Sequence, residues 1–299
     1  MNKELRVGLI GLDTSHAPAF TKLLNDVSHP HHVAGGRVVA AFPGGSPDFG
    51  LSRDRVEAFT AQVQAEGDVS ILSSPAAVAE KSDAIILASV DGRVHLQQFQ
   101  EIAPFGKPVF IDKPFATTSA DAHAIAALAK QYDIPLMSSS ILRYGQPLIE
   151  ALESAESLVG ADCSGPMDLE ETQPGLLWYG IHSVEMLYAA LGQGCEHVTA
   201  ISTPDGEFVT GVWKDGRIGT VRGYRGGKKN FGALLHGEKT SRYVDVMTHP
   251  KPAYAGLLES VLEMFQTKKP SIAIDETLEI VRFIEAANQS RQSGERVNL

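Results

Sequence analysis

The sequence predicts an α/β protein with two domains, in which a parallel sheet covered by helices is followed by an α+β domain with a mainly antiparallel sheet. The first observation behind this prediction is a regular alternation of apolar strands and helical patterns through residues 1–140. The second is the end of that alternation after Pro147. The third is a pair of Asp-Gly turns, at 205–206 and 215–216, because such turns join antiparallel neighbours.

Each expected strand of the first domain is short and apolar, and a helical pattern follows it. Continuous apolar strands are typical of sheets that are buried on both faces, and right-handed crossovers connect such strands. The alternation predicts one domain over residues 1–140 and a second over 141–299, with a final helix that packs back on the first domain. The expected strands are Leu5–Ile10, Arg37–Phe42, Val69–Ile71, Asp83–Ser89, Pro108–Ile111 and Ile134–Ser140.

Composition narrows the class of protein. The chain has 299 residues, more than one compact domain usually needs, and its 43% hydrophobic content is ample for a core. A net charge of −10 argues against nucleic acid or an anionic membrane as the main partner. There is no apolar signal region and no run of roughly 18 apolar residues, and Cys163 and Cys195 lack CxxC spacing. We expect a soluble protein of the reducing cytoplasm.

The turn after the first strand is the first candidate binding element. The nucleotide fingerprint G-x-G-x-x-G would place glycines at 11, 13 and 16, and only Gly11 is present. Thr14 and Ser15 still supply hydroxyls and backbone N–H groups near a helix N-terminus, where an anion is favoured. A carboxylate at Asp13 would repel a pyrophosphate unless it caps the helix or points away. We expect these four residues to border a nucleotide.

The end of the second strand bears on the choice of nucleotide. NAD-selective sites normally have an Asp or Glu here that binds the ribose 2′-hydroxyl, whereas this chain has Pro43 and Gly44. Ser46 and Arg53 are available partners for a 2′-phosphate, although Arg53 is equally well interpreted as an exposed helix residue. This pattern favours NADP over NAD.

Lys113 follows the strand Pro108–Ile111 and lies between Asp112 and Pro114. Open parallel sheets bind ligands at the carboxyl ends of their strands, so this ammonium is a candidate acid–base group. The alternative is a surface lysine with Asp112 as an incidental neighbour.

The loop before the second strand contains three histidines in four residues, His29, His31 and His32. Pro30 interrupts the regular geometry, and no acidic or cysteine partner is close in sequence. We therefore expect no metal site in this chain.

The second half is rich in strands. A helix is expected over Leu148–Leu158, followed by a linker and by a helix that carries His182. An antiparallel sheet with one face covered by its own helices commonly offers the other face to a partner, so we expect a homodimer or homotetramer through this sheet. The expected strands are His197–Ser202, Phe208–Trp213, Ile218–Tyr224, Phe231–His236 and Arg242–Val246.

Two short motifs are specific enough to indicate a family. Asp112-Lys113-Pro114 ends one strand, and Arg143-Tyr144-Gly145-Gln146-Pro147 follows the next. Together they resemble the Glu-Lys-Pro and Arg-aromatic-x-x-Pro motifs of the Gfo/Idh/MocA family of NAD(P)-dependent dehydrogenases. Ser89 and His95 occupy positions similar to those of the cofactor-contacting segment in that family.

A third motif resembles the family in the second domain. The family pattern D-x-G-x-H-x-x-D corresponds here to Trp178 through Glu185, in which Gly180 and His182 match. Glu185 replaces the second aspartate, and Trp178 replaces the first. An alternative for His182 is a helix histidine that is satisfied in the protein interior.

The resemblance implies a Rossmann-type dinucleotide-binding domain and a C-terminal domain for substrate binding and oligomerisation. It implies NAD or NADP as cofactor and hydride transfer between nicotinamide and a hydroxyl or carbonyl of a sugar, cyclitol or related small polyol. Lys113 and His182 are the predicted catalytic acid and base, facing one another across the crevice that holds the nicotinamide. The predicted cofactor-binding residues are Gly11, Asp13, Thr14, Ser15, Ser46, Ser89, His95, Asp112 and Lys113, and the predicted substrate-binding residues are Arg143, Trp178, Tyr179 and Glu185.

Two other classes of function stay open. Trp178 in place of an acid, together with the incomplete glycine fingerprint, is compatible with a non-redox or transient-redox sugar-modifying enzyme on the same fold. The other class is a noncatalytic nucleotide-binding sensor. Nucleotide titration followed by turnover assays separates these classes from a dehydrogenase.

Overall fold

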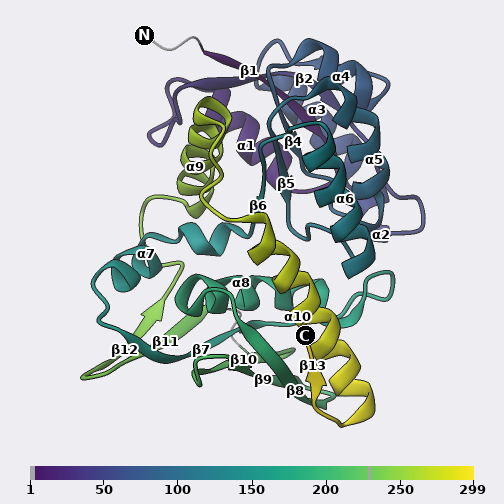
Figure 1. The fold of residues 1–299 in the computed structure, drawn as a ribbon. Coiled ribbons are helices and arrows are strands. Elements are labelled where there is room, and N and C mark those ends of the chain that lie inside the picture. Colours follow the sequence, from purple (N-terminus) through teal and green to yellow (C-terminus); the bar gives the residue numbers. More distant parts are fainter. Residues whose placement is uncertain (1–3, 228–229) are drawn as a thin grey trace. The chain divides into compact units, whose positions relative to one another are not determined.

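Six parallel strands form the sheet of the N-terminal half, in the spatial order β3-β2-β1-β4-β5-β6. Figure 1 labels β1, β2, β4, β5 and β6 of this sheet. The computed structural model describes residues 4–227 and 230–299. Strand order reverses at β1, which pairs with β2 on one side and β4 on the other, and ligands of open α/β sheets bind at such a point. The predicted Rossmann-type sheet is confirmed. Its strands are β1 (Leu5–Ile10), β2 (Gly36–Phe42), β3 (Ser70–Ile71), β4 (Ala84–Leu87), β5 (Val109–Asp112) and β6 (Leu136–Ser139).

Helices cover this sheet, as the continuous apolar strands require. Val7, Leu9 and Ile10 of β1 are fully buried, and Phe20 of α1 packs its ring 5.7 Å from that of Tyr254 in α9. The helices of this part are α1 (His16–Asn25), α2 (Gly50–Arg53), α3 (Val56–Ala65), α4 (Pro75–Lys81), α5 (His95–Ile102), α6 (Ser119–Gln131) and α9 (Ala253–Thr267), with 3₁₀ turns at Gly92–Val94 and Ala103–Phe105.

The chain groups into two compact units, each made of several segments. The first unit comprises Met1–Ala116, Ala120–Ser139 and Tyr254–Ile274, and the second comprises Thr117–Ser119, Ser140–Ala253 and Asp275–Leu299. Most of α9 therefore groups with the parallel sheet, whereas the long helix α10 (Ile274–Ser293) groups with the second unit. The functional division at residue 140, into a dinucleotide-binding and a substrate domain, stays a prediction.

The second unit contains a sheet of seven strands in the order β12-β11-β7-β10-β9-β8-β13. All neighbouring strands are antiparallel except β7 and β10, so the predicted mainly antiparallel sheet is confirmed. The strands are β7 (Leu158–Pro166), β8 (Cys195–Thr203), β9 (Gly206–Trp213), β10 (Ile218–Tyr224), β11 (Gly232–Gly237), β12 (Ser241–Asp245) and β13 (Val297–Asn298). The helices are α7 (Gln146–Glu153), α8 (Gly180–Leu191) and α10, with 3₁₀ turns at Ile141–Tyr144 and Gly175–Leu177.

Strand β7 is the main element that the sequence prediction missed. The segment was expected to be a linker after a helix ending at Leu158, but α7 ends at Glu153 and β7 begins at Leu158. Glycines at 160 and 165 reduce the β propensity of this strand. A Cβ on Gly165 would lie 2.3 Å from the Phe231 ring, so packing against a distant residue requires that glycine.

Helix α8 packs on one face of the second sheet. A Cβ on Gly219 of β10 would lie 2.7 Å from Leu187 and Leu191 of α8, which shows how closely helix and strand approach. Tyr188 of α8 has its ring centroid 5.7 Å from those of Trp213 and Phe283, and these buried rings form part of the core of the unit. Within the described parts of the chain, no helix has the length and apolar character needed to cross a membrane.

Candidate functional site

The turn after β1 is tight because it passes directly against the end of β4. Gly11 has a φ of +89°, which favours glycine, and a Cβ there would lie 2.2 Å from the backbone nitrogen of Ser89. The N–H groups of Gly11 and Leu12 donate to the carbonyls of Phe42 and Pro43 at the end of β2. Gly11 therefore joins the ends of three adjacent strands.

Asp13 is 1% exposed and bonds to helix α2 and to the segment after β4. Its carboxyl accepts a hydrogen bond from the Ser52 hydroxyl at 2.6 Å and another from the Val90 N–H at 3.0 Å. Burial raises the pKa of Asp13, although these hydrogen bonds oppose the shift. The sequence left two alternatives, that this carboxyl caps α1 or that it points away from the helix end. It does not cap α1 and points away.

Thr14 and Ser15 lead into α1. The Thr14 hydroxyl accepts from the His16 N–H at 3.3 Å, and Ser15 is exposed at the N-cap position without a side-chain cap. Within the described residues, no group hydrogen-bonds the backbone N–H of Thr14 or Ser15. These two donors stand at the positive end of a helix, which is the kind of position where an anion is favoured.

The segment after β2, which includes α2, holds the proposed 2′-phosphate partners Ser46 and Arg53. Ser46 is 5% exposed, and its backbone N–H donates to the Ser52 hydroxyl at 2.7 Å. Arg53 is exposed, but its guanidinium already donates to Asp54 at 2.8 Å and to the Pro47 carbonyl at 3.3 Å. A 2′-phosphate would have to compete with Asp54 for this arginine.

Ser89 and His95 are turned into the protein. The Ser89 hydroxyl donates to the Gln98 amide oxygen at 2.8 Å. The fully buried His95 has one ring nitrogen 2.8 Å from the Ser89 carbonyl and the other 3.2 Å from the Phe115 carbonyl. His95 therefore ties the end of β4 to the segment that follows Lys113.

Lys113 is half-buried at the end of β5, and its backbone N–H donates to Asp112 at 2.9 Å. Burial lowers the pKa of the Lys113 amine, while Asp112 raises it and Arg55 lowers it further. The other carboxyl oxygen of Asp112 pairs with Nδ1 of His16. Sequence analysis missed His16; the available signal was its position, where the fingerprint would have its third glycine.

In the second unit, His182 lies on α8 and is 7% exposed. Its Nδ1 is 2.7 Å from the hydroxyl of Ser140, and its ring packs edge-on against those of Tyr179 and Phe231, each with a centroid distance of 5.5 Å. Ser140 was not predicted as a partner of His182. Its signal was the run of three serines that ends at this residue.

The charged substrate candidates of the second unit bind one another. The Arg143 guanidinium donates to Glu185 and pairs with Glu276 at 2.6 Å. Burial raises the pKa of Glu185, although Arg143 opposes the shift. Trp178 is also buried, with its ring 6.3 Å from that of Tyr179. The predicted substrate roles of these residues stay predictions, and a ligand would have to compete for Arg143.

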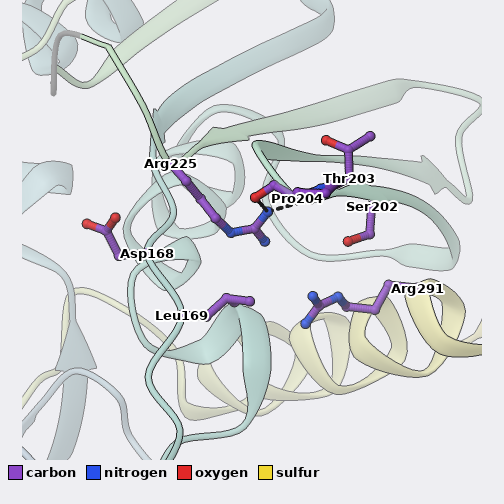
Figure 2. A pocket seen from close by; sticks show the side chains of 7 residues that line it. All are labelled: Asp168, Leu169, Ser202, Thr203, Pro204, Arg225 and Arg291. Atoms are coloured by element: carbon purple, nitrogen blue, oxygen red, sulfur yellow. Dashed lines mark hydrogen bonds between the residues drawn. The ribbon is translucent and has the colours of Figure 1, made fainter.

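A surface cavity of about 670 Å³ opens on the second unit (Figure 2). Arg225 and Arg291 both reach it, but both pair with the buried Glu207, Arg291 at 2.9 Å. Arg225 also donates to the backbone carbonyls of Thr203 and Pro204. These arginines therefore serve the fold. Among the described residues, no three His, Cys, Asp or Glu side chains are grouped to hold a metal ion.

Residues 5–139 match the model of an oxidoreductase family with an NAD-binding Rossmann fold. No curated protein matches the chain in sequence. The parallel sheet, with its left-handed glycine after β1, is consistent with this family description.

Solved structures of similar fold extend over nearly the whole chain. The chain is 16% identical to GenD2 from gentamicin A biosynthesis, solved with NAD, with a TM-score of 0.79 over 99% of this chain and 97% of that one. It is 15% identical to myo-inositol dehydrogenase from Lactobacillus casei, solved with NAD(H) and myo-inositol, with the same TM-score and coverage. A probable dehydrogenase from Thermotoga maritima is 17% identical, with a TM-score of 0.77 and 98% coverage of both chains. At these identities the likeness establishes the fold.

Proposed function

Because residues 5–139 match the Gfo/Idh/MocA oxidoreductase family model, we propose that this chain transfers a hydride between a nicotinamide cofactor and a hydroxyl or carbonyl of a sugar, cyclitol or related small polyol. The observation that carries this proposal is Lys113 at the carboxyl end of β5, where burial lowers the pKa of its amine. An amine with a lowered pKa can donate or accept a proton near neutral pH.

The end of β1 suits a dinucleotide. Gly11 leaves room where a side chain would clash, and the backbone N–H groups of Thr14 and Ser15 would hold the pyrophosphate at the N-terminus of α1. When bound, the nicotinamide supplies the hydride chemistry. The buried Asp13 is directed at Ser52 and Val90, which removes the expected repulsion of the pyrophosphate.

The absence of an acid at the end of β2 supports the use of NADP as well as NAD, since no carboxylate there would repel a 2′-phosphate. Ser46 and Arg53 are the proposed partners of that phosphate. The hydrogen bonds from Arg53 to Asp54 weigh against a large preference for NADP.

We assign proton transfer to Lys113 and His182. The Ser140 hydroxyl restrains the imidazole of His182, and the rings of Tyr179 and Phe231 pack against it, which favours one ring orientation. Arg143, Trp178, Tyr179 and Glu185 are the proposed substrate-side residues. Support for a polyol substrate comes from the family and from the myo-inositol dehydrogenase of similar fold.

A homo-oligomer through the second sheet is part of the proposal. Ile201 of β8, Ile218 of β10 and Tyr243 of β12 are 65%, 53% and 60% exposed, and covering these side chains would remove apolar surface from water. Cys163 and Cys195 are buried and unpaired, which supports the expected cytoplasmic compartment.

The test is fluorescence titration with NADH and NADPH, followed by turnover on a panel of sugars and cyclitols at the nicotinamide absorbance band. We expect binding of at least one nucleotide and an absorbance change with at least one polyol. Failure to bind either nucleotide would reject the proposal.

Trp178 in place of an acid, and Asp13 and His16 in place of glycines, favour a second candidate function, a non-redox or transient-redox sugar-modifying enzyme. Nucleotide binding and conversion of a sugar without net absorbance change would support that candidate and reject the first.

A further inference from the structure

An imidazole at the start of α1 and a carboxyl at the end of β5 form a pair beside Lys113. Nδ1 of His16, the first residue of α1, contacts Oδ2 of Asp112 at the end of β5, and the two side chains are 9% and 3% exposed. The other oxygen of Asp112 accepts the backbone N–H of Lys113. One carboxyl therefore links the histidine to the proposed proton-transfer residue.

The His16 ring is held in one orientation. Its centroid lies 5.0 Å from that of Tyr254 in an edge-on contact and 5.5 Å from that of Phe20. Nδ1 is engaged by Asp112, whereas Nε2 has no hydrogen-bond partner in residues 4–227 and 230–299. A ring fixed in this way can gain a proton at Nε2 without losing its contact to Asp112.

We propose that His16 is a positioning residue for Lys113: it fixes the Asp112 carboxylate against the lysine and, by gaining a proton at Nε2, changes the histidine–carboxylate pair from negative to neutral. The charge beside the Lys113 ammonium then depends on the state of His16. The catalytic consequence of this arrangement rests on the proposed function. The effect of His16 on the Lys113 amine can be measured on the apoprotein alone.

The groups around the pair determine the sign of the effect. Asp112 stabilises the Lys113 ammonium, while Arg55, the residue before α3, and burial both destabilise it. Tyr254 faces His16 from α9 with an edge-on ring contact. Protonation of His16 offsets the charge of Asp112, so the lysine should release its proton more readily when His16 is charged.

In a purely structural role, His16 would only donate a hydrogen bond to the buried carboxyl of Asp112. The substitution His16→Asn separates the two roles, because the asparagine amide can donate to Asp112 from about the position of Nδ1 but cannot gain a proton. Asp112→Asn removes the charge and leaves a side chain of the same size.

The experiment measures the reactivity of the Lys113 amine with acetic anhydride in short pulses from pH 5 to pH 10, read by peptide mass spectrometry. It uses the full chain without nucleotide or polyol, with the exposed Lys239 as the internal reference. Wild type, His16→Asn and Asp112→Asn are compared after thermal melting has shown that each folds.

We expect Lys113 to react up to about tenfold faster in wild type than in His16→Asn at pH 5, with the two profiles converging toward pH 10, because only the wild-type imidazole can gain a proton and a neighbouring charge shifts a pKa by about one unit. Asp112→Asn should increase the reactivity about tenfold between these limits.

Coincident wild-type and His16→Asn profiles at every pH would overturn the inference and leave His16 with a structural role. If His16→Asn does not fold, unchanged reactivity in Asp112→Asn has the same consequence. Turnover lost with Lys113→Ala, together with coincident labelling profiles, would reject this inference and retain the proposed function. Labelling profiles that differ between wild type and His16→Asn, without any nicotinamide turnover, would retain this inference and reject the proposed function.

Discussion

The two units contain buried charged groups that are arranged in contrasting ways. In the first unit, His16, Asp112 and Lys113, here called the edge network, leave Nε2 of the histidine without a hydrogen bond to any described residue and the lysine half-buried. In the second unit, Arg143, Glu185 and Glu276, here called the arginine network, pair one guanidinium with two carboxyls.

This difference indicates which buried charged groups can take part in proton transfer. A charge that is paired inside the core loses stability when its partner is removed, because it is then left buried without compensation. A group with one atom still available can exchange a proton while its contacts persist. We therefore expect the edge network to govern turnover and the arginine network to govern stability.

The largest expected effect is on turnover. Lys113→Ala should lower kcat by about 10²–10⁴-fold, because it removes a general acid–base group, and should change the melting temperature little. Lys107→Ala is the matched control, since that ammonium donates to the carbonyls of Ala79 and Ser82. Steady-state kinetics and thermal melting check both variants. Wild-type turnover in Lys113→Ala would remove the edge network from the reaction.

The next effect is on stability. Arg143→Met should lower the free energy of unfolding by about 3–5 kcal/mol, because Glu185 and Glu276 would be left buried without their cation. Urea denaturation measures the loss, and the double variant Arg143→Met, Glu185→Leu should recover part of it. A loss below about 1 kcal/mol in the single variant would show that the arginine network is not the structural element described here.

A smaller effect is expected at Ser140, whose hydroxyl contacts His182 and accepts the Leu142 N–H at 3.2 Å. Ser140→Ala should cost about 1 kcal/mol of stability and lower kcat/KM by about tenfold through a less restrained imidazole. Ser183→Ala is the control, because within the described chain the buried Ser183 hydroxyl has no hydrogen-bond partner. Equal kinetics in the two variants would show that Ser140 does not position His182.

The smallest effect is a change in the pH dependence of stability. Burial raises the pKa of Asp13, so the folded chain keeps a proton that the unfolded chain has lost above its ordinary value of 3.8. The contribution of Asp13 to stability is thus largest below that value and falls as pH rises through the raised pKa. Asp13→Asn should flatten this slope in urea titrations between pH 4 and pH 7. An unchanged slope would contradict the assignment to Asp13.

The sequence was most informative where the pattern is local. Alternating apolar strands and helices predicted the six strands of the parallel sheet, and the Asp-Gly turns predicted the hairpins of the second sheet. Strand β7 was missed because Gly160 and Gly165 weaken the β signal, and only contacts such as that of Gly165 with Phe231 explain why they are present.

The candidate site residues also divide into those that a local pattern predicted and those that depend on distant contacts. Lys113 was found from a strand end and a motif, both of which lie within a few residues. The pairing of His16 with Asp112 and that of Ser140 with His182 join positions 96 and 42 residues apart, and no periodicity or motif relates them.

The sequence alone thus determined the class of each unit and the strand end that carries the amine, because side-chain periodicity and turn chemistry are properties of neighbouring residues. Only the tertiary structure decided which charged groups neutralise one another and which keep a nitrogen available for proton exchange. That outcome depends on burial and on partners from distant segments, and both are created when the sheets and helices pack.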